Sequence, residues 1–204
     1  MNLAACGTLP RTPENAVWYR LILPGHLTTA LGSAHTKLRS GRFNAGPLLP
    51  PHDQFPILSF ADDLIVAQFE VGAVLGSLTP GGYLPHPRHS SFVTLNVQII
   101  LHDVIDLTGV STAQAPLGTN AQELTGDWRG YNTRTASTSV SVPTGSAPTQ
   151  ELGKALSSTG VEGFRSISAK VTHHKTLFVF PNNLRTGSSL TFSDPSGAIV
   201  HQIP

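Results

Sequence analysis

Two charged residues, Arg20 and Glu70, lie in segments of the sequence that otherwise consist largely of apolar residues. Arg20 interrupts the run AVWYRLIL, and a guanidinium inside a core strand costs free energy unless an anion pairs with it. Glu70 lies in ADDLIVAQFEVGAVL, where an unpaired buried carboxylate is also unfavourable. Arg20 therefore requires an anionic partner, and the carboxylate of Glu70 requires a partner of its own.

A third candidate is Ser168, in the segment GFRSISAK. A serine nucleophile needs a neighbouring base, and the sequence shows no His–Asp arrangement that would activate this one. Ser168 is therefore interpreted as a hydrogen-bonding group that positions other atoms.

Each of these residues also has a purely structural explanation. Arg20 could end in a salt bridge, and Glu70 could pair with an arginine such as Arg42. Ser168 could be a small strand residue that bonds the backbone. Taken singly, none of the three residues indicates an active site.

The elements expected to position them follow from apolar patterning and turn residues. We expect the class to be α+β, a single compact domain with a central, mostly antiparallel sheet and flanking helices. The domain is expected to span residues 1–204, with its core at about 16–183. The expected strands are 16–23, 57–60, 92–108 turning a corner into a second strand, 163–168 and 175–181; the expected helices are 62–75, buried, and 149–158; a Ser/Thr-rich loop is expected at 131–148 and a C-terminal hairpin within 186–204.

Composition narrows the class of function. The formal charge is +1 and the 13 basic residues are scattered, which argues against nucleic acid or an anionic membrane as the main partner. Cys6 is the only cysteine, so a reducing compartment, the cytoplasm, is expected. His86 and His89, and the pair His173–His174, lack the flanking acids and the helical spacing of a metal site, so no metal is expected.

Several short motifs, taken in order, resemble the RES-domain family, the toxin half of bacterial toxin–antitoxin pairs. WYRL carries the first-strand arginine, Arg20, and SGRFN (40–44) resembles the family's GGRWN. PILSFADDLIVAQFE is similar to the strand and helix that lead to the family's glutamate, Glu70. DW (127–128), TQELG (149–153), GFRSISAK (163–170), which contains Ser168, and TLFVFPN follow in the family's order.

The resemblance implies a fold similar to ADP-ribosyltransferases and NAD+ as substrate. Members cleave the bond between nicotinamide and ribose, with water or phosphate as acceptor, or transfer ADP-ribose to a protein. It implies catalytic roles for Arg20, Glu70 and Ser168, with Ser168 hydrogen-bonding the nicotinamide-side ribose or the nicotinamide amide. It also implies NAD+ contacts from Arg20, Arg42, Asn44 and Ser59. A cognate helix-turn-helix antitoxin of the Xre type is the expected partner.

The motifs also depart from the family pattern. Ser59 stands where many members have a tyrosine, Ile167 where they have a proline, and Lys170 where they have an arginine. Tyr19 is a possible substitute for the missing ring, but alternation along a strand predicts that it faces away from Arg20. The departure at Ser59 motivates an alternative, a RES-like fold that binds nucleotides or proteins without catalysis.

Overall fold

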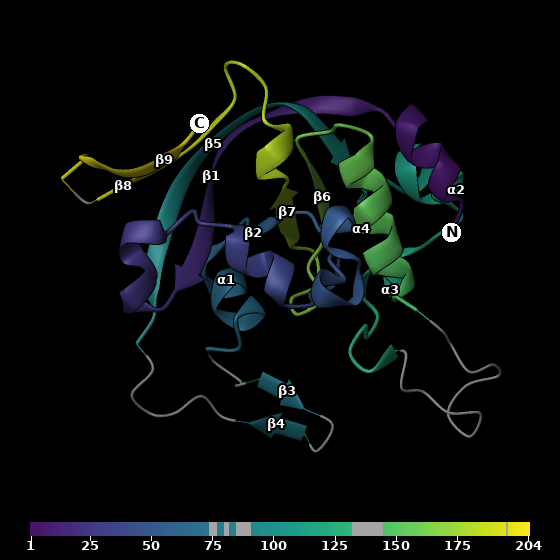
Figure 1. The fold of residues 1–204 in the computed structure, drawn as a ribbon, viewed down its shortest axis with the longest axis horizontal. Coiled ribbons are helices and arrows are strands. Elements are labelled where there is room, and N and C mark those ends of the chain that lie inside the picture. Colours follow the sequence, from purple (N-terminus) through teal and green to yellow (C-terminus); the bar gives the residue numbers. More distant parts are fainter. Residues whose placement is uncertain (74–76, 80–81, 85–90, 132–144, 195) are drawn as a thin grey trace.

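The structure is a computed structural model that describes residues 1–73, 77–79, 82–84, 91–131, 145–194 and 196–204. Most of the expected loop at 131–148 lies outside these residues, as do His86 and His89. The described chain is a single domain of mixed α and β structure, in which a long sheet is flanked by helices (Figure 1). This confirms the fold class expected from the sequence.

The strands and helices have the following bounds. The strands are β1 (Arg11–Ile22), β2 (Leu58–Ala61), β3 (Ser77–Thr79), β4 (Gly82–Leu84), β5 (Val93–Asp106), β6 (Gly163–Ile167), β7 (Lys175–Val179), β8 (Ser189–Ser193) and β9 (Ile199–Ile203). The α-helices are α1 (Leu64–Glu70), α2 (Ala115–Leu117), α3 (Ala121–Thr125) and α4 (Pro148–Ser158). Short 3-10 turns occupy most of the segment between β1 and β2.

The main sheet has the order β1-β2-β7-β6-β5-β8-β9, and β1 also pairs along β5. All of its pairings are antiparallel except the one between β5 and β6. The pairings β1–β2, β2–β7, β7–β6, β6–β5 and β5–β1 close a ring of five strands. This ring brings Arg20 on β1 and Ser59 on β2 close to the β6–β7 turn, although the sequence separates these segments widely.

Buried side chains form three clusters around the sheet. One packs α4, α3 and the N-terminal turn against β6 and the end of β5, and includes Phe43, Leu152 and Phe164. A second packs the long strands β1 and β5 against β2, β7 and β8. The third and smallest holds α1 against β1 and β2 through Leu21, Ala61 and Val66. Helix α1, which carries Glu70, is therefore attached to the sheet through few apolar contacts.

Two expectations about the elements are wrong. The helix expected at 62–75 is shorter, because Asp63 caps its first turn through the amide of Ile65 and Gly72, at φ 75°, ends it in a left-handed conformation. It is not fully buried either, since 60% of Ile65 is exposed.

The second wrong expectation concerns residues 92–108, which were expected to turn a corner. They form β5, one continuous strand, because β1 pairs with it along nearly its whole length. β1 correspondingly begins at Arg11 and accommodates Pro13 at a register shift between Thr12 and Glu14.

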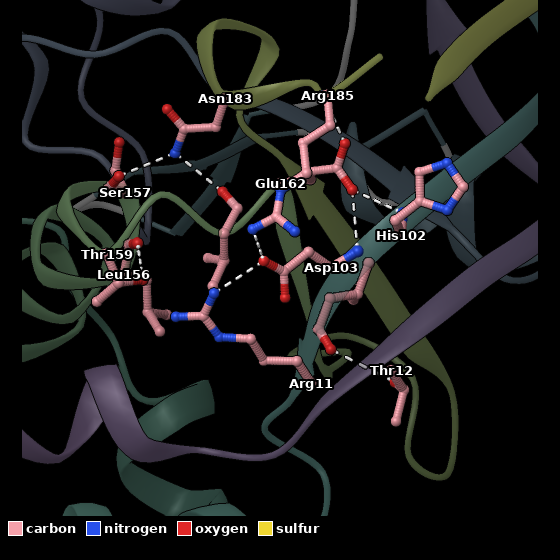
Figure 2. A network of polar contacts seen from close by, with 12 residues as sticks. Arg11, Thr12, His102, Asp103, Leu156, Ser157, Thr159, Glu162, Asn183 and Arg185 are labelled. Carbon is pink, nitrogen blue, oxygen red and sulfur yellow. Dashed lines mark hydrogen bonds and ion pairs between the residues drawn. The ribbon is translucent and has the colours of Figure 1, made fainter. Parts of the chain in front are cut away.

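A buried polar network fixes the end of the sheet that is formed by β1, β5 and the segment before β8 (Figure 2). Asp103 pairs with Arg11, at 2.8 Å, and with Arg185. Glu162 accepts hydrogen bonds from the backbone amides of His102, Asp103 and Arg185. Burial raises the pKa of Glu162, but the hydrogen bonds that its carboxylate accepts outweigh this effect and leave the pKa below its ordinary value.

Candidate active site

A cavity of about 410 Å³ opens between β1, β2, β7, α1 and the loop at 35–44. This volume falls within the range of roughly 300–1,000 Å³ typical of small-molecule sites. Apolar and aromatic side chains supply part of its wall, and polar side chains supply the rest. The lining includes Tyr19, Arg20, Arg39, Arg42, Asn44, Ser59, Glu70, Trp128, Arg129 and Lys170.

The described lining is strongly cationic. It contains four arginines and one lysine but a single carboxylate, that of Glu70. Burial lowers the pKa of His35, and the neighbouring positive charges of Arg20, His26 and Arg39 lower it further. Such a concentration of positive charge favours an anionic ligand with several acceptor oxygens.

Arg20 contributes a charge that no described carboxylate neutralises. Its Nη1 donates to the carbonyl of Ser59, at 2.9 Å, and its guanidinium carbon lies 5.7 Å from the centroid of the Phe60 ring. Its Nε is buried and, among the described residues, has no hydrogen-bond partner. Burial lowers the pKa of Arg20 to about 10, which leaves the side chain charged at neutral pH. The salt bridge that would explain Arg20 structurally is therefore absent from the described chain, and an anionic ligand would supply the missing partner.

Glu70 ends α1 and faces the cavity, where it is exposed rather than buried as the helix pattern predicts. Helix C-termini carry partial negative charge, which disfavours a carboxylate at this position. Glu70 is held there because its Oε1 accepts a hydrogen bond of 2.7 Å from the hydroxyl of Ser168. Two residues that are 98 positions apart in the sequence are thus in direct contact.

The Ser168 hydroxyl uses its whole hydrogen-bonding capacity within the protein. Its Oγ accepts from the amides of Lys170 and Val171, both at 3.2 Å, and donates to Glu70. Because a serine oxygen has two lone pairs and one proton, no lone pair is left for nucleophilic attack. Ser168 is buried and directs its proton to the carboxylate, not to a ligand in the cavity.

Arg42 is presented by a tight turn, in which Gly41 and Asn44 form a β-bridge. Its Nη1 donates to the carbonyls of Leu124 and Gly126 at the end of α3. Burial lowers the pKa of Arg42, and the charge of Arg129 adds to this effect while those of Glu70 and Asp127 oppose it. Arg42 is thus fixed near both the carboxylate and a second arginine.

Helix α4 holds this turn from behind. Gln150 donates to the carbonyl of Gly41 at 3.0 Å, and Gly153 has no side chain because a Cβ there would overlap the backbone of Phe43. These contacts explain why the motif TQELG accompanies SGRFN in the sequence. The helix fixes the position of the loop that carries Arg42.

Asn44 and Ser59 both line the cavity, but they differ in what they can offer a ligand. The amide of Asn44 donates to the carbonyl of Thr36 and its Oδ1 accepts from the amide of Gly46, at 2.7 and 2.9 Å. Asn44 is buried and stabilises the loop. Ser59 is exposed to the cavity and carries no ring.

Tyr19, like Arg20, is among the residues that line the cavity. Strand β1 pairs with β2 at Tyr19, opposite Ala61, and Tyr19 packs against the small cluster that holds α1 on the sheet. The guanidinium of Arg20 lies instead against the ring of Phe60. That the two side chains face opposite ways stays a prediction.

Sequence reasoning missed several residues of the site. Arg39, Arg129 and Lys170 line the cavity, and the Arg129 guanidinium lies 5.0 Å from the centroid of the Trp128 ring. Of these, only Trp128 and Lys170 lay in recognised motifs, DW and GFRSISAK, and nothing in the local sequence marks Arg39 or Arg129.

A His–Asp pair lies beside the segment that carries Ser168. The Nδ1 of His174 lies 3.1 Å from Oδ1 of Asp62, and the backbone of His174 contacts Ser168. No hydrogen bond joins the ring of His174 to the Ser168 hydroxyl in the described structure, so this pair does not form a serine triad.

Among the described residues, no three His, Cys, Asp or Glu side chains are grouped so that they could hold a metal ion. No helix of this part of the chain combines the length and apolar character needed to cross a membrane.

Comparison with known proteins identifies the family. The model of the RES domain matches residues 17–198, which is most of the chain. The chain belongs to the RES-domain family. No curated protein matches this RES domain. A solved structure with the same fold is a chain of the M. tuberculosis MbcT–MbcA toxin–antitoxin complex, with a TM-score of 0.67 and 18% identity over 94% of this chain and 88% of that one.

Proposed function

We propose that this RES domain is a toxin-type enzyme that cleaves the bond between nicotinamide and ribose in NAD+. The observation that carries the proposal is the pairing, in one cavity, of a single held carboxylate with an excess of arginines. NAD+ combines a pyrophosphate, which suits arginines, with a ribose that becomes positively charged as nicotinamide leaves.

Glu70 would stabilise the reacting sugar. Loss of nicotinamide produces an oxocarbenium-like ribose, and a carboxylate held beside it lowers the energy of that state more than the energy of the substrate. The hydrogen bond from Ser168 fixes the carboxylate before the substrate binds, so no reorganisation is needed during the reaction. Ser168 acts through Glu70 and has no direct chemical step.

Arg20 and Arg42 would hold the pyrophosphate. Guanidinium groups bind phosphate oxygens in a planar, bidentate manner, and the buried Nε of Arg20 has no hydrogen-bond partner among the described residues. Tyr19 and Trp128 also line the cavity, and their rings would offer apolar surfaces for the bases. Water, phosphate or a protein side chain would then accept the ribose, as in enzymes of the ADP-ribosyltransferase type.

The biological role we propose is that of a toxin whose activity an antitoxin protein suppresses. The support is membership of the RES-domain family, together with the shared fold of the chain from the MbcT–MbcA toxin–antitoxin complex. We propose an antitoxin of the helix-turn-helix, Xre-like type and action in the cytoplasm, where NAD+ is available.

The test is to incubate the purified protein with NAD+, with and without phosphate, and to measure released nicotinamide by chromatography. We expect release by the wild type and a loss of at least about 100-fold in kcat for Glu70→Gln, which keeps the shape but removes the charge. Glu151→Gln, on α4, is the matched control and should retain full activity.

Unchanged NAD+ under both conditions, or full activity of Glu70→Gln, would refute the proposal. Transfer of labelled ADP-ribose to protein in a lysate would instead identify a protein as the acceptor. Expression in a bacterium gives a second readout: the wild type should arrest growth, and Glu70→Gln should not.

A further inference from the structure

Helix α1 is anchored at both ends by one segment, which consists of the turn between β6 and β7 (168–174) and the first residue of β7, Lys175. At its C-terminal end, Glu70 accepts the hydroxyl proton of Ser168. At its N-terminal end, Asp62 immediately precedes the capping residue of the helix and contacts the other side of the turn. A seven-residue helix has little stability of its own, so these contacts determine where its last residue lies.

Asp62 makes three contacts with this segment, two with Lys175 at the start of β7 and one with His174 just before it. Its Oδ2 accepts from the amide of Lys175 at 2.8 Å, and its own amide donates to the carbonyl of Lys175 at 3.1 Å. Its Oδ1 lies 3.1 Å from Nδ1 of His174. Because an ionised carboxylate only accepts hydrogen bonds, Nδ1 of His174 carries the proton in this contact.

The backbone of His174 continues the connection to Ser168. The carbonyl of His174 accepts from the amide of Ser168 at 2.8 Å, and the amide of His174 donates to the carbonyl of Val171 at 3.4 Å. The preceding residue, His173, has a φ of 68°, which lies in the left-handed region that residues other than glycine rarely adopt. A turn held in this conformation needs support from its surroundings, and the Asp62–His174 contact supplies it.

We propose that Asp62 and His174 are positioning residues for the Glu70 carboxylate. They hold the 168–174 turn so that the Ser168 hydroxyl meets Glu70, and they hold the start of α1 so that Glu70 meets Ser168. Neither residue lines the cavity, so neither contacts the substrate. This inference rests on the proposed function for its kinetic readout, and on the Ser168–Glu70 contact for its structural one.

The adjacent aspartates provide a matched pair of variants. Asp62→Asn removes the negative charge, and it can keep the bond from Lys175 only by turning its NH2 group toward Nδ1 of His174, which must then give up its proton. Asp63→Asn makes the same chemical change one residue later, where asparagine caps a helix as well as aspartate does. We expect kcat to fall about ten-fold or more in Asp62→Asn, since misplacing a reacting group by about 1 Å can cost about 100-fold, with KM within about two-fold of the wild type. Asp63→Asn should retain the wild-type kcat.

Two variants of His174, one that keeps a hydrogen-bond donor and one that does not, test its positioning role. The side-chain amide of asparagine occupies nearly the position of Nδ1, so His174→Asn should keep most of kcat, whereas His174→Leu should lose about as much as Asp62→Asn. Equal kcat for Asp62→Asn and Asp63→Asn, or for the two His174 variants, would overturn the proposal.

A crystal structure of Asp62→Asn separates this inference from the proposed function. We expect the distance between Ser168 Oγ and Glu70 Oε1 to exceed hydrogen-bonding range in this variant, whether or not the wild type cleaves NAD+. An unchanged contact would refute the positioning role, while an inactive wild type with a broken contact in the variant would refute the proposed function alone. A variant that failed to fold would be replaced by His174→Leu in the same measurement.

Discussion

At the scale of single residues, the site depends on which hydrogen-bonding capacities are already used. Both lone pairs and the proton of the Ser168 hydroxyl have protein partners, whereas Nε of Arg20 has none among the described residues. A group with all its bonds satisfied fixes other atoms, and a buried group with an unused donor is prepared for a ligand. We therefore propose that Ser168 positions Glu70 and that Arg20 is the anion-binding group of the site.

Ser168→Ala tests this division. The substitution removes the donor to Glu70 and leaves the amides of Lys170 and Val171 without their acceptor, so we expect kcat for NAD+ cleavage to fall about 10- to 100-fold while KM changes little. The neighbouring Ser166→Ala is the control, because the buried Ser166 hydroxyl has no described hydrogen-bond partner and its loss should leave kcat unchanged. Equal kinetics for the two variants would exclude a role for the Ser168 hydroxyl.

At the scale of elements, the cavity is assembled by parts that are poorly stable by themselves. The turn carrying Arg42 contains little regular structure and relies on Gln150 and Gly153 of α4. Helix α1 is short and relies on the β6–β7 turn. The longest strands, β1 and β5, provide the rigid frame to which these parts attach.

Gly153→Ala should separate helix propensity from packing. Alanine stabilises a helix interior by about 1 kcal/mol relative to glycine, but here its Cβ would overlap the carbonyl of Phe43. Overpacking against backbone costs about 1–3 kcal/mol, so we expect a net loss of stability and a higher KM for NAD+ as Arg42 moves.

Chemical denaturation and steady-state kinetics would measure these two effects. Gly25→Ala, where an added Cβ meets no atom within 4 Å, is the control. A Gly153→Ala protein with greater stability than the wild type would show that the turn can move away from α4 without cost.

At the scale of the whole molecule, we expect stability and activity to depend on different ends of the sheet. The Asp103–Glu162 network joins β1, β5 and the segment before β8, and its residues do not line the cavity (Figure 2). Changes there should alter the folding free energy and leave the chemistry intact.

Glu162 gives this separation a pH dependence. Its folded-state pKa lies below the ordinary value of 4.5, so it contributes stability above about pH 4.5 that is lost as the pH falls through the folded-state pKa. Glu162→Gln directs an amide group at backbone N–H donors, and we expect it to cost about 2–3 kcal/mol at pH 7.

Denaturation curves at about pH 7, 4.5 and 3 would measure both quantities. The free energy of unfolding should fall less steeply with acid in Glu162→Gln than in the wild type or in Glu151→Gln. Parallel pH profiles for all three proteins would contradict the role assigned to Glu162.

The sequence by itself determined the class of fold, most of the elements and three candidate residues. Apolar alternation and turn residues depend on local backbone geometry, and they indicated β2, α4, β6, β7 and the final hairpin. The order of short motifs indicated the RES-domain family, which the match over residues 17–198 confirms.

Only the tertiary structure decided which groups meet. The wheel pattern of α1 could not show that Ile65 is exposed or that Glu70 faces a cavity, since burial depends on what packs against a helix. The contacts of Ser168 with Glu70 and of Asp62 with His174 join residues about a hundred positions apart, and no local pattern in a chain specifies a contact over that separation.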